Sequence, residues 1–168
     1  SKAVCIAGTH GKTTTSTMTA HLFHQSHVEC SAFLGGISNN YNTNLLISTQ
    51  SNFVVVEADE YDRSFHHLTP YMAVITSLEA DHLDIYGTYE AVIDSFQHFA
   101  SLIAPGGALI LNKKIDFQPK LKKGVKFYTY GLGQTADFHA NNIRKIHENL
   151  YFDFVTPTET IHDIRLGV

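Results

Sequence analysis

Cysteine, positive charge and long apolar runs are all scarce in this sequence. Cys5 and Cys30 are the only cysteines among 168 residues, too few for a disulfide framework, so we expect two free, buried thiols in a reducing compartment. The formal net charge of −4 argues against a nucleic-acid-binding surface and against attraction to an anionic membrane. No apolar run approaches the roughly 20 residues that cross a bilayer, and no signal-peptide pattern opens the chain. These absences favour a soluble cytoplasmic globule.

Solvated ends are also lacking. A strand-like run begins at Lys2, and the chain stops at Gly167 and Val168 without a helical cap or a polar tail. Natural domains usually begin and end in solvated segments, so we expect a piece of a longer protein. Because 43% of the 168 residues are hydrophobic, residues 1–168 can bury one core and are predicted to form a single domain.

Short apolar runs alternate with helical patterns over the first two thirds of the chain. The runs are continuous, as in strands that are buried on both faces of a parallel sheet. Thr88 is the expected N-cap of the second helix, which Pro105 and the two glycines after it end. We therefore predict an α/β fold with a mostly parallel sheet and helices on both faces. The expected strands are residues 2–7, 53–56, 72–75 and 108–111, and the expected helices are residues 12–25 and 89–103.

The last quarter of the chain has a different pattern. Partial alternation predicts short strands at residues 125–130, 138–146, 150–156 and 160–166. Glu148 and Asn149 resemble a hairpin turn between two of these strands. We expect a small antiparallel C-terminal extension of the same domain.

A polar stretch without periodicity, Asn39 to Asn44, follows Gly35 and Gly36. A simple surface loop is one interpretation. A substrate-facing loop is the other, because side-chain amides can both donate and accept hydrogen bonds with sugar hydroxyls or phosphates.

A glycine-rich segment between the first strand and the first helix carries the strongest chemical signal. Glycines let backbone amides approach phosphate oxygens, and a helix N-terminus adds unsatisfied donors and partial positive charge. Lys12 can reach the β- and γ-phosphates, and the Thr13 hydroxyl can ligate magnesium. The usual P-loop spacing requires glycine where Ile6 stands, so this is a shorter Gly-x-x-Gly-Lys-Thr loop. We predict a P-loop-type fold that binds a nucleoside triphosphate through Gly8, Thr9, His10, Gly11, Lys12, Thr13 and Thr14.

Acidic residues follow the second predicted strand. Ligands bind at the carboxyl ends of strands in open α/β sheets, and Glu57 there can hold Mg²⁺ directly or through water. Its neighbours Asp59, Glu60 and Asp62 repel one another unless a cation or Arg63 offsets them. A solvated acidic turn is the alternative interpretation.

A second polar segment, Glu79 to Asp84, follows the third predicted strand. It contains His82, which reaches the same edge of the sheet. Histidine is not a preferred ligand of magnesium, so chemistry alone favours a structural or solvated His82 over a metal ligand.

The phosphate loop at 8–15 and the segments at 57–65 and 79–84 together resemble the central domain of the Mur ligases. The resemblance spans roughly residues 2 to 166. It implies a three-domain enzyme in which flanking domains hold a UDP-sugar and an amino acid, while this domain binds ATP and Mg²⁺. It also implies that Lys12 and Thr13 hold phosphate and magnesium, and that Glu57 and His82 are magnesium ligands, which makes Lys12, Glu57 and His82 the expected catalytic residues.

The closest resemblance is to the branch that joins L-alanine to UDP-N-acetylmuramate through an acyl phosphate. His10 fits that branch, and so does the absence of lysine from 88–104, where sister ligases often carry a carbamylated lysine. Many relatives have asparagine where this chain has Ser77, which leaves that position without a role. The alternatives are a murein peptide ligase, which adds a tripeptide, a P-loop kinase, and a nucleotide-binding module that is inactive alone.

Overall fold

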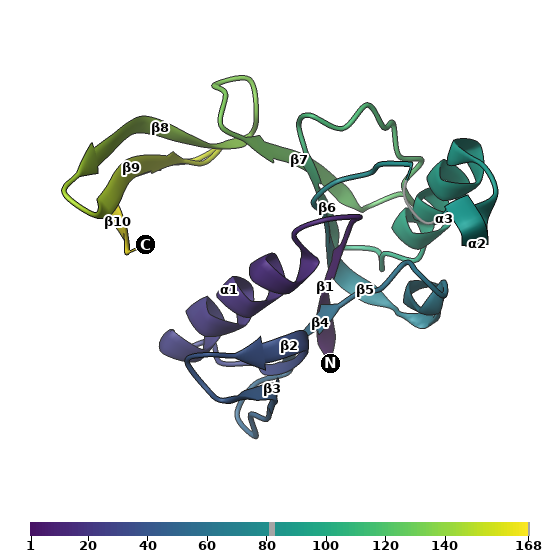
Figure 1. Ribbon diagram of the computed structural model, residues 1–168, viewed down its shortest axis with the longest axis horizontal. Coiled ribbons are helices and arrows are strands. Elements are labelled where there is room, and N and C mark those ends of the chain that lie inside the picture. Colours follow the sequence, from purple (N-terminus) through teal and green to yellow (C-terminus); the bar gives the residue numbers. More distant parts are fainter. Residues whose placement is uncertain (81–82, 168) are drawn as a thin grey trace.

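The sheet is built around β1 (Lys2–Ala7), which lies near its middle (Figure 1). In the computed structural model, which describes residues 1–80 and 83–167, β1 pairs in parallel with β4 (Phe53–Glu57) on one side and β5 (Pro70–Ile75) on the other. Next to β5, the parallel sheet continues through β6 (Ala108–Asn112) and β7 (Lys126–Gly131). The predicted mostly parallel sheet is confirmed.

Two strands on the other side of β4 were not predicted. β2 (Ser31–Ser38) pairs in parallel with β4, and β3 (Thr43–Leu46) pairs antiparallel with β2 at the edge of the sheet. Gly35 and Gly36 weaken the strand signal of β2, and β3 begins with polar residues. The polar stretch expected as a loop is therefore a loop only as far as Asn42, because its last two residues belong to β3.

The C-terminal extension is antiparallel, as predicted, but it begins later than predicted. It consists of β8 (Phe138–Ile146), β9 (Asn149–Val155) and β10 (Thr160–Gly167). β7 is not part of it, since β7 pairs in parallel with both β6 and β8. The turn between β8 and β9 is formed by His147 and Glu148, one residue earlier than expected. In Figure 1 the three strands form an arm that extends outward from the end of β7.

Helices cover both faces of the parallel strands, as predicted. α1 (Lys12–Gln25) lies against one face, and α3 (Tyr89–Ser101) lies against the other, next to the short α2 (Leu83–Tyr86) and the 3₁₀ helix η1 (Ser64–His67) (Figure 1). Alternate residues of β1 enter two separate hydrophobic clusters. The cluster beneath α1 contains Val4, Ile6, Ala20, Leu34 and Val55, and the cluster beneath α3 contains Cys5, Ala7, Phe65, Phe96 and Phe99.

The two cysteines are free and buried, as predicted. Burial raises the pKa of Cys5 to about 12. Burial, with a smaller contribution from the Glu29 carboxylate, raises the pKa of Cys30 to about 11. Among the described residues, no helix is long and apolar enough to span a membrane.

Thr88 caps α3 as the sequence indicates, because its side-chain oxygen accepts a hydrogen bond from the amide of Ala91 at 3.2 Å. Replacing it with alanine leaves that amide without its acceptor. We expect Thr88→Ala to lower the free energy of unfolding of this chain by about 1 kcal/mol. Urea denaturation followed by circular dichroism measures the change. Thr88→Ser keeps the oxygen and serves as the control, so an equal loss in both variants contradicts the cap.

Candidate functional site

The carboxyl ends of three adjacent strands bring the predicted site residues together. The amide of Ala58 donates to the carbonyl of Ile6 at 2.8 Å, and the amide of Thr76 donates to the carbonyl of Ala7 at 3.0 Å. These bonds hold the segment after β4 on one side of the glycine-rich loop and the segment after β5 on the other side. This edge is where open α/β sheets bind ligands.

The glycine-rich loop turns sharply into α1. Gly8 has φ 137° and Gly11 has φ 82°, conformations that favour glycine. A Cβ on Gly8 would also lie 2.2 Å from the Thr76 hydroxyl oxygen. No side chain caps α1, whose first backbone hydrogen bond runs from the Thr15 amide to the Gly11 carbonyl. The amides that precede Thr15 at this helix start are therefore the donors that an anion can use.

Residues after β5 brace the back of the loop. The Thr76 hydroxyl donates to the carbonyl of His10 at 2.6 Å, and the amide of His10 donates to the Ser77 hydroxyl at 2.7 Å. The amide of Glu79 donates to the Thr9 hydroxyl at 2.9 Å. Ser77, to which the sequence assigned no role, thus shapes the phosphate loop. Its signal was its position two residues after a predicted strand.

A cavity of about 410 Å³ lies in front of the loop. Every predicted loop residue except Gly8 lines it, and Glu57 lines it from the end of β4. Gly8 lies behind the cavity, against Thr76. The complete lining consists of Thr9, His10, Gly11, Lys12, Thr13, Thr14, Glu57 and Asp59.

Glu57 is held by groups from α1 and β2. Its Oε1 accepts a hydrogen bond from the Thr13 hydroxyl at 3.0 Å, and its Oε2 accepts one from the Gly35 amide at 2.9 Å and a longer one from the Ser16 hydroxyl at 3.4 Å. A Cβ on Gly35 would lie 2.3 Å from Oε1, so any other residue at this position requires the carboxylate to move. Sequence reasoning did not identify Gly35, whose contact spans 22 residues.

Lys12 lies in a pocket of acceptors beside the cavity. Its Nζ donates to the carbonyl of Gly8 at 2.9 Å and lies 3.0 and 2.8 Å from the two carboxylate oxygens of Glu60. Asp59 lies further away, at 3.9 Å. Lys12 is thus a cation that offsets the acidic cluster, whereas Arg63 stacks over the ring of Tyr86 at 5.0 Å.

Thr13 and Glu57 carry hard oxygen atoms of the kind that Mg²⁺ prefers as ligands. Magnesium is commonly held by one or two carboxylates together with substrate phosphates and water. One carboxylate and one hydroxyl that line the cavity in front of the glycine-rich loop, which we call the anion cavity, therefore fit this ion. The predicted ligand His82 lies outside the described residues. Within the described part of the chain, no cluster of three or more His, Cys, Asp or Glu side chains could hold a metal on its own.

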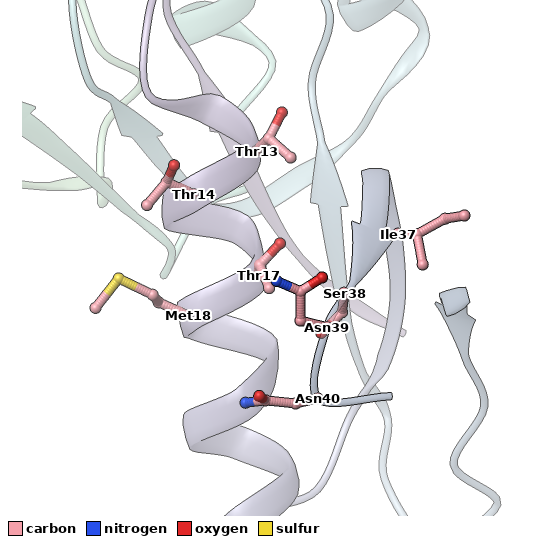
Figure 2. A pocket seen from close by; sticks show the side chains of 8 residues that line it. All are labelled: Thr13, Thr14, Thr17, Met18, Ile37, Ser38, Asn39 and Asn40. Carbon is pink, nitrogen blue, oxygen red and sulfur yellow. The ribbon is translucent and has the colours of Figure 1, made fainter. Parts of the chain in front are cut away.

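A second cavity of about 290 Å³ adjoins the first and shares Thr13 and Thr14 with it. Figure 2 shows Thr13, Thr14 and Thr17 along α1, with Ser38, Asn39 and Asn40 facing them from the end of β2. The polar stretch after β2 therefore lines a cavity next to the phosphate loop, as its substrate-facing interpretation requires.

The parallel sheet, the glycine-rich loop between β1 and α1, and the carboxylate at the end of β4 define an α/β protein of the P-loop type. The family model of the Mur ligase middle domain matches residues 6–168. The chain belongs to this family.

Comparison with known proteins gives the same family. The chain is 62% identical to the UDP-N-acetylmuramate–L-alanine ligase of Phocaeicola vulgatus over 167 residues, which are 99% of this chain and 36% of that protein. It thus spans about a third of the length of this relative.

Two solved structures share the fold. The UDP-N-acetylmuramate:L-alanyl-gamma-D-glutamyl-meso-diaminopimelate ligase from Neisseria meningitides has a TM-score of 0.80 and 23% identity, over 99% of this chain and 55% of that one. The MurF ligase from Thermotoga maritima in complex with ADP has a TM-score of 0.75 and 14% identity, over 99% of this chain and 40% of that one.

Proposed function

We propose that this chain is the ATP-binding domain of a ligase that joins L-alanine to UDP-N-acetylmuramate, with flanking domains of the same protein holding the two other substrates. The arrangement that supports phosphoryl transfer is the pair of oxygens on Thr13 and Glu57, 3.0 Å apart, at the mouth of the anion cavity. A carboxylate and a hydroxyl in that place suit a metal–phosphate complex better than a simple anion.

ATP is the proposed nucleotide. The backbone amides at the start of α1 would bind its phosphates, and Lys12 would balance the charge of its β- and γ-phosphates. The related MurF structure is a complex with ADP, which supports a nucleotide in the same fold. In addition to Thr13 and Glu57, His82 is proposed as a magnesium ligand.

The proposed reaction begins when the lactyl carboxylate of UDP-N-acetylmuramate attacks the γ-phosphorus and ADP leaves, giving an acyl phosphate. The amine of L-alanine then attacks the acyl carbon, loses a proton, and displaces inorganic phosphate. Magnesium, when bound, neutralises charge on the phosphate oxygens. The residues of this chain hold the triphosphate in line with the carboxylate and stabilise the transferred phosphoryl group, which is the main source of catalysis in such reactions.

The acceptor amine is proposed from sequence similarity. Identity of 62% to a UDP-N-acetylmuramate–L-alanine ligase favours L-alanine. The solved tripeptide-adding and alanine-adding ligases, at 23% and 20% identity, support the fold alone. The second cavity lies beside the phosphate loop, where the carboxylate substrate has to approach. This is the position expected for part of the UDP-sugar.

The test uses the full-length protein with ATP, Mg²⁺ and UDP-N-acetylmuramate. We expect L-alanine to give ADP, phosphate and an amide product of the corresponding mass, and the tripeptide L-alanyl-γ-D-glutamyl-meso-diaminopimelate to give none. Ligation of the tripeptide instead identifies a murein peptide ligase. A phosphorylated product without an amide identifies a kinase. The isolated chain is expected to bind ATP weakly and to ligate nothing, because it lacks two substrate domains.

A further inference from the structure

Glu60 is the one buried carboxylate among the described residues. Its side chain is 2% exposed, whereas the side chain of Asp59 is 57% exposed. Buried charges in proteins are retained where they are paired, because removal from water costs several kcal/mol per ion. Glu60 forms an ion pair with Lys12, the residue proposed to bind the phosphates.

The backbone around Glu60 is fixed from three sides. The amide of Arg63 donates to the Glu60 carbonyl at 3.1 Å, and the hydroxyl of the buried Tyr86 donates to the same carbonyl. Five residues after Glu60, Phe65 is fully buried and stacks on Phe99 with ring centroids 4.9 Å apart. The loop after β4 is thus anchored in the core beneath α3, and the Glu60 carboxylate has a fixed position relative to the sheet.

Lysine is a flexible side chain with three donor hydrogens on its ammonium group. Here that group donates hydrogen bonds to the Gly8 carbonyl at 2.9 Å and to Glu60 Oε1 at 3.0 Å, and it lies 2.8 Å from Glu60 Oε2 in an ion pair. The Lys12 side chain is only 14% exposed. A side chain that is free in most surface positions is thus held in one conformation at the wall of the anion cavity.

We propose that Glu60 is a positioning residue, which holds the Lys12 ammonium where the transferred phosphoryl group needs it. Glu57 and Asp59 line the cavity, whereas Glu60 lies behind Lys12 and acts through it. Because Glu60 already holds the Lys12 side chain, no further conformational entropy is lost in ordering it when ATP binds. The ammonium group is also kept from binding to the exposed Asp59 instead. This proposal rests on the proposed function.

The test is Glu60→Gln in the full-length enzyme, which keeps the shape of the side chain and removes its charge. We expect kcat to fall by about 30-fold, because a misplacement of 1 Å costs up to about 100-fold and glutamine retains one acceptor. The KM for L-alanine is expected to remain at the wild-type value. Asp62→Asn is the matched control, since it removes the same charge from an exposed position in the same loop. Wild-type kcat in Glu60→Gln overturns the proposal.

A double-mutant cycle separates positioning from a merely structural role. In a Lys12→Ala background, Glu60→Gln is expected to change kcat no further, since Glu60 acts through Lys12. An equal loss in both backgrounds overturns the proposal. If Glu60→Gln does not fold, Tyr86→Phe, which removes one of the two donors to the Glu60 carbonyl, takes its place in the cycle with a smaller expected loss.

A wild-type enzyme that ligates neither acceptor rejects the proposed function but still leaves the positioning role testable. The cycle is then measured as affinity for a non-hydrolysable ATP analogue by calorimetry. A change caused by Glu60→Gln in the wild-type background but not in Lys12→Ala supports the role. An equal change in both backgrounds, or none in either, overturns it.

Discussion

Lys12→Ala in the full-length enzyme is expected to lower kcat by about 10²–10³-fold, the usual cost of removing one preorganised group that stabilises transition-state charge. Charge develops on the phosphoryl oxygens during transfer, and Lys12 is the cation at the cavity wall. Phosphate release under saturating ATP, L-alanine and UDP-N-acetylmuramate measures the loss. The exposed Lys114→Ala, which removes the same charge elsewhere, is the control.

Lys12→Ala also affects stability, which the experiment has to separate from catalysis. The substitution leaves the buried Glu60 carboxylate without its ammonium, and breaking a buried ion pair typically costs about 3–5 kcal/mol. The melting temperature and the folded fraction are therefore measured for the same preparation. Near-wild-type turnover per folded molecule rejects a catalytic role for Lys12, whatever the change in stability.

Much of the fold follows from local sequence patterns. β1, α1 and α3 were predicted because short apolar runs, a glycine-rich turn and a threonine cap are each visible within a few residues. β2 and β3 were missed, since their glycines and polar residues form strands only through pairing with β4. β7 was assigned to the antiparallel extension because the direction of a strand depends on its neighbours, here β6 and β8.

The sequence predicted which loop and which carboxylate come together, but it did not predict the contacts that support them. Residues 9–14 of the loop and Glu57 line one cavity, as expected from the strand ends. The contacts that hold them were not predictable, because they join distant residues. Glu60 lies 48 residues from Lys12, and Ser77 lies 67 residues from His10. No pattern in the sequence distinguishes the buried Glu60 from its exposed acidic neighbours.

Removal of the proposed magnesium ligand Glu57 is expected to have a large effect on the magnesium dependence of activity. Glu57→Ala removes the carboxylate beside Thr13, so we expect the Mg²⁺ concentration for half-maximal activity to rise by about 100-fold, the upper end of the range for residues that support a metal site. Initial rates at increasing Mg²⁺, with ATP held as its magnesium complex where possible, measure this shift. Unchanged magnesium dependence would remove Glu57 from the proposed ligand set.

Gly35 allows the same site to be tested without changing a ligand. A Cβ at position 35 would lie 2.3 Å from Glu57 Oε1, whereas a Cβ at position 36 would meet only a methyl carbon of Thr13 at 3.4 Å, an ordinary contact. Gly35→Ala must therefore displace the carboxylate, and we expect it to raise the Mg²⁺ requirement by about tenfold. Gly36→Ala is expected to leave that requirement unchanged. Equal behaviour of the two neighbouring variants contradicts the role of Glu57, because only one of them moves its carboxylate away from Thr13.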